Sequence, residues 1–345
     1  MSTPGWEPDV LGAPFSKLTL PLGEDDEGPV VATLVRALAA HSTLDRLFGD
    51  RRPLHDVDVL YLHGWSDYFF QRSLAQYWID RGADFYALDL RKYGRSIRPG
   101  QTPGYITHLS TYDEEIDAAL AAMDRPLDGP PIERRLVLLG HSTGGLILSL
   151  WASDHPGAAA ALILNSPWLE FQLRAVTRAA VAPLVDLRAR LRPLDTLPQV
   201  DLGYYSRAQR EVRATPFDIN LQWRPDQTMP VHAGWLDAIL DGQNRVANGL
   251  HIDAPICVLL SAKSIPPTRW SEELTNADTV VVVDDIARAA LKLGESVSVE
   301  RIPGALHDVF LSRADARDLA YERLDRWVVG SLGTERLPLA PGSYP

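Results

Sequence analysis

Residues 140–144 read Gly-His-Ser-Thr-Gly, a G-x-S-x-G pattern that is typical of a nucleophilic serine on a sharp turn. The apolar run 136–139 before it predicts a buried strand, and the apolar run 146–151 after it predicts a helix. Where a strand breaks directly into a helix, the middle residue is forced into a strained conformation with its side chain pointing outward. Glycines two residues to either side avoid the clashes that a Cβ would cause there. We therefore predict that Ser142 is a nucleophile; the alternative is a glycine-rich turn that carries an ordinary serine.

A serine hydroxyl is a weak nucleophile at neutral pH, so Ser142 requires a general base, an acid that orients this base, and donors for an oxyanion. Of the nine histidines, His307 fits the role of the base best. It follows the last predicted strand, 297–302, and comes after every candidate acid. It also lies just past Gly304, where the chain must turn back over a sheet. The alternative is a loop histidine that bonds to the backbone.

The orienting acid is expected after the strand predicted at 255–260. Asp278 stands there at the start of an apolar run and is the preferred residue, although a long stretch separates it from the strand. Asp284 remains an alternative. However, the adjacent pair Asp284-Asp285 is typical of a helix start, where carboxylates interact favourably with the positive end of the helix dipole. Glu272 and Glu273 also remain open.

The oxyanion donors are expected to be two backbone N–H groups, that of Thr143 after the nucleophile and that of Trp65. Gly64 precedes Trp65 and allows a close approach of the backbone; the alternative is a plain strand-to-helix turn. The Trp65 side chain is expected to shape a substrate pocket. Three further aromatic residues are pocket candidates, although each could equally belong to the core of its own segment: Trp168, Tyr204 and Trp223.

The elements that must position these residues alternate between strand and helix. The runs 18–22 and 30–35 flank an acidic turn and predict an antiparallel hairpin. Continuous apolar strands separated by helical patterns predict a mostly parallel sheet that is covered on both faces. The expected strands lie at 57–62, 84–88, 136–139, 160–164, 255–260 and 297–302. The predicted fold class is α/β, a doubly wound sheet with an inserted cap.

The strand–helix alternation lapses between residues 168 and 250. This stretch holds six prolines and several aromatic residues, which is more apolar material than a linker carries. We therefore expect a catalytic core in two parts, with a cap between them and a C-terminal tail after them: core 1–167, cap 168–250, core 251–330 with acid and base, and tail 331–345. The last helix is expected to open with a capping box at Ser312-x-x-Asp315.

Composition narrows the classes of partner. A formal charge of −11, without any Lys/Arg run to offset it, argues against nucleic acid. The single cysteine, Cys257, excludes an internal disulfide and is expected to be a packed core thiol. The chain shows no signal-peptide pattern and no apolar stretch long enough to span a bilayer, which predicts a cytoplasmic protein without a transmembrane segment. Neither metal-ligand spacing nor a cofactor fingerprint is present, so no metal and no cofactor are expected; oligomeric state stays open.

Five motifs together resemble the α/β-hydrolase superfamily, and more narrowly its lysophospholipase, monoacylglycerol lipase and serine aminopeptidase-like branch. They are His63-Gly64-Trp65-Ser66-Asp67, Asp89-x-Arg91-x-x-Gly94-x-Ser96, Gly140-His-Ser-Thr-Gly-Gly145, Asp278-x-Val-Val and His307-Asp308. The resemblance covers about residues 55–165 and 252–330. It implies that Ser142 is acylated, that His307 is base and then acid, and that Asp278 orients the imidazole. It also implies oxyanion donation by Trp65 and Thr143.

Three functions follow as hypotheses. The first is a serine hydrolase for small-molecule carboxylic esters with an apolar acyl or alcohol part. The second is a serine aminopeptidase-like hydrolase, which needs cap carboxylates such as Glu170 or Glu211 to hold a substrate ammonium. The third is a catalytically silent ligand-binding protein of the same fold; His307 argues against it, because such proteins typically lose the base. A serine at position 142 also argues against carboxylate-nucleophile chemistry of the epoxide hydrolase or dehalogenase kind.

Overall fold

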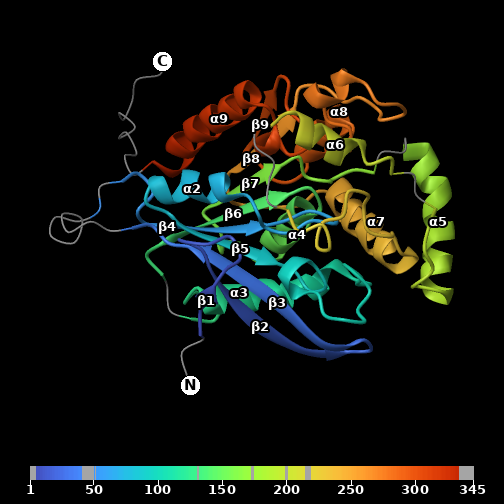
Figure 1. The fold of residues 1–345 in the computed structure, drawn as a ribbon, viewed down its shortest axis with the longest axis horizontal. Helices are drawn as coiled ribbons and strands as arrows, with labels where there is room; N and C mark the ends of the chain where they lie inside the picture. Colours follow the sequence, from blue (N-terminus) through green and yellow to red (C-terminus); the bar gives the residue numbers. More distant parts are fainter. Residues whose placement is uncertain are drawn as a thin grey trace, which may run out of the picture.

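The computed structural model describes residues 5–40, 50, 52–129, 132–171, 175–198, 201–213 and 219–333. In these residues one nine-stranded sheet runs through the molecule in the order β1-β2-β3-β5-β4-β6-β7-β8-β9 (Figure 1). The strands are β1 (Glu7–Pro8), β2 (Ser16–Asp25), β3 (Gly28–Ala37), β4 (Val57–Leu62), β5 (Asp84–Asp89), β6 (Arg135–His141), β7 (Ala161–Asn165), β8 (Ile256–Ser261) and β9 (Val297–Ile302).

The sheet has an antiparallel edge and a parallel body. β2 and β3 form the predicted hairpin, and β3 pairs with β5 in antiparallel register. From β5 onward, through β4, β6, β7, β8 and β9, neighbouring strands are parallel. The prediction of a mostly parallel, doubly wound sheet is therefore confirmed. Parallel strands direct all their carboxyl ends to one edge, and this edge is where loop side chains from distant segments can meet.

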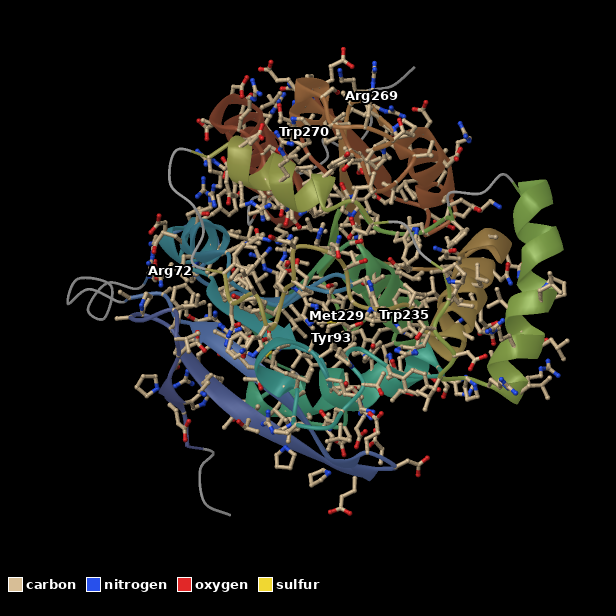
Figure 2. All side chains as sticks on the ribbon, turned by 45° about the vertical axis from the view of Figure 1, so that its right-hand side comes forward. Arg72, Tyr93, Met229, Trp235, Arg269 and Trp270 are labelled. Carbon is tan, nitrogen blue, oxygen red and sulfur yellow. The ribbon has the colours of Figure 1, made fainter. Side chains whose placement is uncertain are left out.

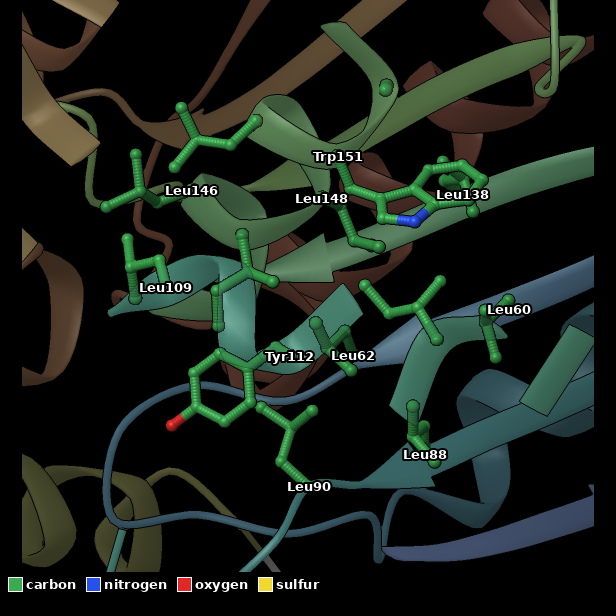
Figure 3. Close-up of a cluster of buried hydrophobic side chains, with 14 of the residues drawn as sticks. Leu60, Leu62, Leu88, Leu90, Leu109, Tyr112, Leu138, Leu146, Leu148 and Trp151 are labelled. Carbon is green, nitrogen blue, oxygen red and sulfur yellow. The ribbon is translucent and has the colours of Figure 1, made fainter. Parts of the chain in front are cut away.

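Helices cover both faces because successive side chains of a buried strand point to opposite sides. On one face, Leu60, Leu138 and their neighbours pack with α3 (Asp113–Ala122), α4 (Thr143–Asp154) and α8 (Val283–Ala290). Figure 3 shows part of this cluster, with Leu146, Leu148 and Trp151 of α4 above Leu60, Leu62 and Leu88 of neighbouring strands. On the other face, Val59 and its neighbours pack with α2 (Arg72–Asp80) and α9 (Ala314–Leu332).

In its described residues, the segment between β7 and β8 adds no strand to the sheet. Its described part forms α5 (Ala175–Leu191), α6 (Tyr204–Glu211) and α7 (Ala233–Asn248), with an isolated bridge between Thr196 and His232. We call residues 168–250 the cap segment. Two of its large aromatic residues join the main core: Trp235 belongs to the same cluster as α4, and Trp223 packs against the cluster on the opposite face. The cap segment is therefore anchored in the main core.

One local expectation is wrong, and another lies mostly outside the described residues. The capping box at Ser312 and Asp315 is wrong: the N-cap of α9 is Arg313, and it makes no side-chain capping bond. Ser312 Oγ instead accepts a hydrogen bond from the Leu306 N–H at 2.8 Å, inside the loop that carries His307. Of the predicted tail, residues 334–345 lie outside the described residues. No helix in the described ranges is long and apolar enough to cross a membrane.

Candidate active site

Ser142 lies on the turn between β6 and α4, in a conformation that L-residues seldom adopt, with φ 52° and ψ −119°. Glycines make this turn sterically feasible. A Cβ on Gly140 would lie 2.6 Å from the Gly145 Cα, and a Cβ on Gly144 would lie 2.4 Å from the carbonyl oxygens of Leu62 and His63. The predicted sharp strand-to-helix turn is thus present, and it holds the Ser142 side chain at the carboxyl edge of the sheet.

His307 follows β9 on a loop that turns at Gly304, where φ is 74°. Its Nε2 lies 3.1 Å from Ser142 Oγ, and both residues are buried. The distance is within hydrogen-bond reach, so a neutral imidazole with a bare Nε2 can accept the Ser142 proton. The structure therefore places His307 where a base would have to stand, although these side chains are 165 residues apart in the chain.

Asp278 completes a hydrogen-bonded line. Its Oδ2 lies 2.8 Å from His307 Nδ1, and its Oδ1 accepts the N–H groups of Val280 at 2.7 Å and Val281 at 2.9 Å. Three donors thus fix a carboxylate that is fully buried. An acceptor at Nδ1 keeps the ring proton there and leaves Nε2 free to face the serine.

The long stretch between β8 and Asp278 is a loop that leaves the sheet and returns to it. The Asp278 N–H donates to the Lys263 carbonyl and the Ile265 N–H donates to the Asp278 carbonyl, so Asp278 lies beside the end of β8. The alternative acids lie elsewhere. Asp284, in the first turn of α8, is 64% exposed and pairs with Arg301 at 2.7 Å. Glu272 and Glu273 are exposed on a short 3₁₀ turn (Glu272–Asn276).

The loop after β4 passes directly over the nucleophile. A Cβ on Gly64 would lie 2.9 Å from the Ser142 Cβ, which shows how closely the backbone approaches. The His63 side chain holds this loop in place. Its Nδ1 lies 2.8 Å from the Gly64 carbonyl oxygen, and its Nε2 accepts the Leu90 N–H at 3.1 Å. A neutral ring with its proton on Nδ1 satisfies both contacts. The loop that carries the Trp65 N–H is therefore rigidly held beside Ser142, and donation from Trp65 and Thr143 stays a prediction.

A cavity of about 190 Å³ opens beside Ser142 and His307. Trp65 and Trp168 line it, as the sequence suggested, and Trp65 packs against Trp235 with the rings tilted by 39° and their centroids 3.8 Å apart. Figure 2 shows Trp235 at the centre of the molecule near Met229 and Tyr93. The lining residues in full are Gly64, Trp65, Ser66, Asp67, His141, Ser142, Trp168, Tyr205, Ser206, Arg224, Pro225, Thr228, Val231, Trp235, Val280 and His307.

Two predicted pocket residues do not line this cavity. Tyr204 turns the other way on α6 and packs against Trp270, which lies beyond α6 in Figure 2. Its neighbour Tyr205 takes the cavity position, with its ring 5.8 Å from that of His307. Trp223 packs edge-on against Tyr68, away from the nucleophile. The sequence pattern identified the aromatic segment but not the helix face, since adjacent helical residues point about 100° apart.

One ion pair crosses from the cap segment to the core inside the cavity. Arg224 Nε lies 2.8 Å from Asp67 Oδ1, and Arg224 Nη2 donates to Gln209 Oε1 at 2.7 Å. The Met229 N–H also donates to Ser66 Oγ at 3.1 Å. Sequence reasoning missed this pair, because a lone arginine and a lone aspartate far apart in sequence carry no signal of pairing.

The Asp89 motif serves as a brace and makes no contact with the cavity. Asp89 accepts the Phe69 N–H at 2.9 Å and the Arg95 guanidinium at 2.8 Å. Gly94 is required there, because a Cβ would lie 2.5 Å from Asp89 Oδ2. The motif thus fixes the loop that follows Trp65.

Elsewhere, Cys257 is packed in β8, and burial raises the pKa of its thiol. Within the described residues, no group of three or more His, Cys, Asp or Glu side chains could hold a metal ion.

The sheet order, the serine turn and the loops at the carboxyl edge define an α/β-hydrolase fold. Comparison with known families is more specific: the family described as serine aminopeptidase, S33, matches residues 55–313, and the chain belongs to this family. The chain is 25% identical over 281 residues to a monoacylglycerol lipase of Mycolicibacterium smegmatis, which covers 79% of this chain and 88% of that protein. It is 29% identical over 168 residues to lysophospholipase L2 of Escherichia coli K12, covering 48% and 46% respectively.

Solved structures agree on the fold. A monoacylglycerol lipase of Paleococcus ferrophilus superposes with a TM-score of 0.59 at 17% identity, over 79% of this chain and 94% of that one. A monoglyceride lipase of Saccharomyces cerevisiae, in complex with a substrate analogue, gives 0.60 at 13% identity, over 91% and 97%. At these identities the likeness establishes the fold alone.

Proposed function

We propose that the protein is a serine hydrolase that cleaves small-molecule carboxylic esters with an apolar acyl or alcohol part, through an acyl-enzyme on Ser142. The observation that carries this proposal is the continuous line from Ser142 Oγ to His307 Nε2 and from His307 Nδ1 to Asp278 Oδ2, at 3.1 and 2.8 Å. The named relatives, a monoacylglycerol lipase and a lysophospholipase, support ester hydrolysis as the chemistry.

The steps follow from the geometry. Ser142 Oγ attacks the ester carbonyl carbon while its proton passes to His307 Nε2, and Asp278 stabilises the imidazolium that forms. The N–H groups of Trp65 and Thr143 donate hydrogen bonds to the negatively charged former carbonyl oxygen. The imidazolium then gives its proton to the leaving alcohol oxygen, and a water repeats the sequence to release the acid.

The cavity favours an ester with a compact apolar group next to the carbonyl. Its volume of about 190 Å³ and its indole walls, Trp65, Trp168 and Trp235, suit an apolar group. We place substrate selection in the cap segment, 168–250, because it supplies Tyr205 and Trp235 to the walls. The residues before and after it, 1–167 and 251–330, supply the reacting groups.

An aminopeptidase-like activity, suggested by the family description, needs a carboxylate that is available to a substrate ammonium. Asp67 lines the cavity, but Arg224 already pairs with it at 2.8 Å. The other carboxylate at the site, Asp278, is committed to His307 and two backbone N–H groups. These pairings leave ester hydrolysis as the better supported function.

A substrate panel tests the proposal. Wild type and Ser142→Ala are assayed against p-nitrophenyl esters from acetyl to palmitoyl, with aminoacyl-p-nitroanilides in parallel. We expect ester turnover in the wild type that falls by about 10⁴ or more in Ser142→Ala, and no amide turnover. Efficient anilide cleavage with poor ester cleavage would instead establish the aminopeptidase alternative.

A further inference from the structure

A second carboxylate lies next to the proposed base. Asp308 directly follows His307 and is fully buried. Gln71 Nε2 donates to its Oδ2 at 2.6 Å, while Asn165 Nδ2 and the Phe310 N–H donate to its Oδ1 at 2.7 and 3.0 Å. All three donors are neutral groups from separate parts of the fold. Such a set of donors stabilises the charged form of a buried carboxylate and leaves its negative charge free to act on its surroundings.

Asn165 connects Asp308 to the nucleophile. Its side chain donates to Asp308 and accepts the Val309 N–H at 3.1 Å, which fixes the loop of His307. Its backbone carbonyl accepts the Ser142 N–H at 3.0 Å. One residue at the end of β7 therefore holds both the serine turn and the histidine loop. The Ser142–His307 contact of 3.1 Å joins the same two segments.

The cap segment also contacts Asp308 and His307, through Tyr205. The Asp308 N–H donates to Tyr205 Oη at 3.1 Å, and the Tyr205 ring stands edge-on to His307. The titratable and charged groups that sense the Asp308 charge come from the sheet, the serine turn, the cap segment and α9: Tyr61, His141, Tyr205, Arg213, Arg224 and Tyr321. Burial lowers the pKa of His141, and the Asp308 charge opposes this change. The ring of His141 lies only 5.1 Å from that of His307, which is itself faced by Asp278.

We propose that Asp308 is a positioning residue that acts through His307: its carboxylate holds the histidine loop against the serine turn, and its charge favours the imidazolium. The Ser142 proton goes to His307 Nε2 in this scheme, and Asp308 takes no proton. The consequence for turnover rests on the proposed function. The effect of the Asp308 charge on the His307 ring does not rest on the proposed function, because it follows from the position of the charge alone.

The surroundings of Asp308 allow a clean removal of its charge. In Asp308→Asn, the remaining oxygen can keep the bonds from Asn165 and Phe310, while the new amide replaces Oδ2 in front of Gln71. Gln71 Oε1 is buried and has no hydrogen-bond partner. A flip of the Gln71 amide would turn this oxygen toward the new donor, so that all three hydrogen bonds survive. The variant therefore removes a charge and preserves the contacts.

The experiment compares wild type, Asp308→Asn and Asp308→Asn/Gln71→Glu, with the exposed Asp318→Asn as a matched control. Two quantities are measured: the pH profile of kcat/KM on the best ester, and the titration of the His307 ring by NMR of histidine-labelled protein. We expect Asp308→Asn to move both midpoints down by about one pH unit or more, because the imidazolium loses a nearby negative charge. Because a base that is one pKa unit weaker stabilises the transition state less, kcat should fall by at most about tenfold.

The double variant returns a negative charge one side chain farther from His307 and should recover at least half of the pH shift. If both midpoints stay unchanged in Asp308→Asn, or if the double variant recovers nothing, Asp308 acts only by packing and the proposal is wrong. If Asp308→Asn fails to fold, Gln71→Lys takes its place, since an ammonium there neutralises the Asp308 charge and should give the same downward shift. A wild type without ester turnover would refute the proposed function. The NMR titration would then decide by itself whether the Asp308 charge acts on His307.

Discussion

Replacing Asp278 by asparagine separates the role of the acid from its contribution to the fold. Asp278 Oδ1 accepts two backbone N–H groups and Oδ2 faces His307 Nδ1. In Asp278→Asn, the remaining oxygen can keep both backbone bonds, so the new amide must point at Nδ1. An N–H group there requires Nδ1 to be an acceptor, which moves the ring proton to Nε2 and blocks acceptance of the Ser142 proton.

The expected cost is about 10⁴ in kcat, or roughly 5 kcal/mol of transition-state stabilisation. Thermal stability should change little, because the backbone bonds persist. Asp284→Asn is the matched control, since its carboxylate is 64% exposed and pairs with Arg301 on the surface. Such pairs contribute about 0–1 kcal/mol to stability and nothing to turnover.

Steady-state kinetics on a saturating ester and a thermal melt of each variant provide the assay. An Asp278→Asn enzyme that keeps more than a tenth of the wild-type kcat would refute this reasoning. An inactive but folded Asp284→Asn would transfer the acid role to the first turn of α8.

Three further outcomes are expected. Gly64→Ala should lower kcat about 10²–10³-fold with little change in fold, because its Cβ would push the loop of the oxyanion donor off the nucleophile; kinetics and circular dichroism check this. Trp235→Ala should shift the preferred acyl length in an ester series while acetyl-ester turnover survives, and Tyr204→Ala should shift nothing, because only the former lines the cavity. Burial raises the pKa of Asp9, but the hydrogen bonds and charge of Arg95 outweigh burial and hold it below its ordinary value. That stabilisation is present above the unfolded-state pKa and lost as pH falls through the lower folded-state pKa. Asp9→Asn should therefore be less stable than wild type near pH 6 in urea unfolding, with a difference that shrinks below about pH 3.

Much of the fold was predictable because its signals are local. Buried parallel strands are short apolar runs, and the serine turn needs glycines at fixed offsets, so both are visible in a few residues around position 142. The placement of His307 after the last strand followed from topology, since parallel strands deliver their loops to one edge. The structure brings Ser142, His307 and Asp278 together; their catalytic roles stay predictions.

What could not be predicted depends on contacts between distant segments. The loop before Asp278 returns to the end of β8 through backbone bonds to residues 263 and 265, and no side-chain pattern encodes such a return. Ser312 has the spacing of a helix cap, yet the buried Leu306 N–H competes for its hydroxyl. Likewise, the choice of Tyr205 over Tyr204 for the cavity depends on how α6 is rotated against the core.

The central claim is that Ser142 is the nucleophile and that His307 activates it. The most direct measurement is the intact mass of the protein after reaction with a fluorophosphonate, followed by peptide mapping. We predict one adduct, located on Ser142, absent in Ser142→Ala and formed at least 100-fold more slowly in His307→Ala. An adduct on a different residue, or no adduct on folded protein that hydrolyses esters, would contradict the account.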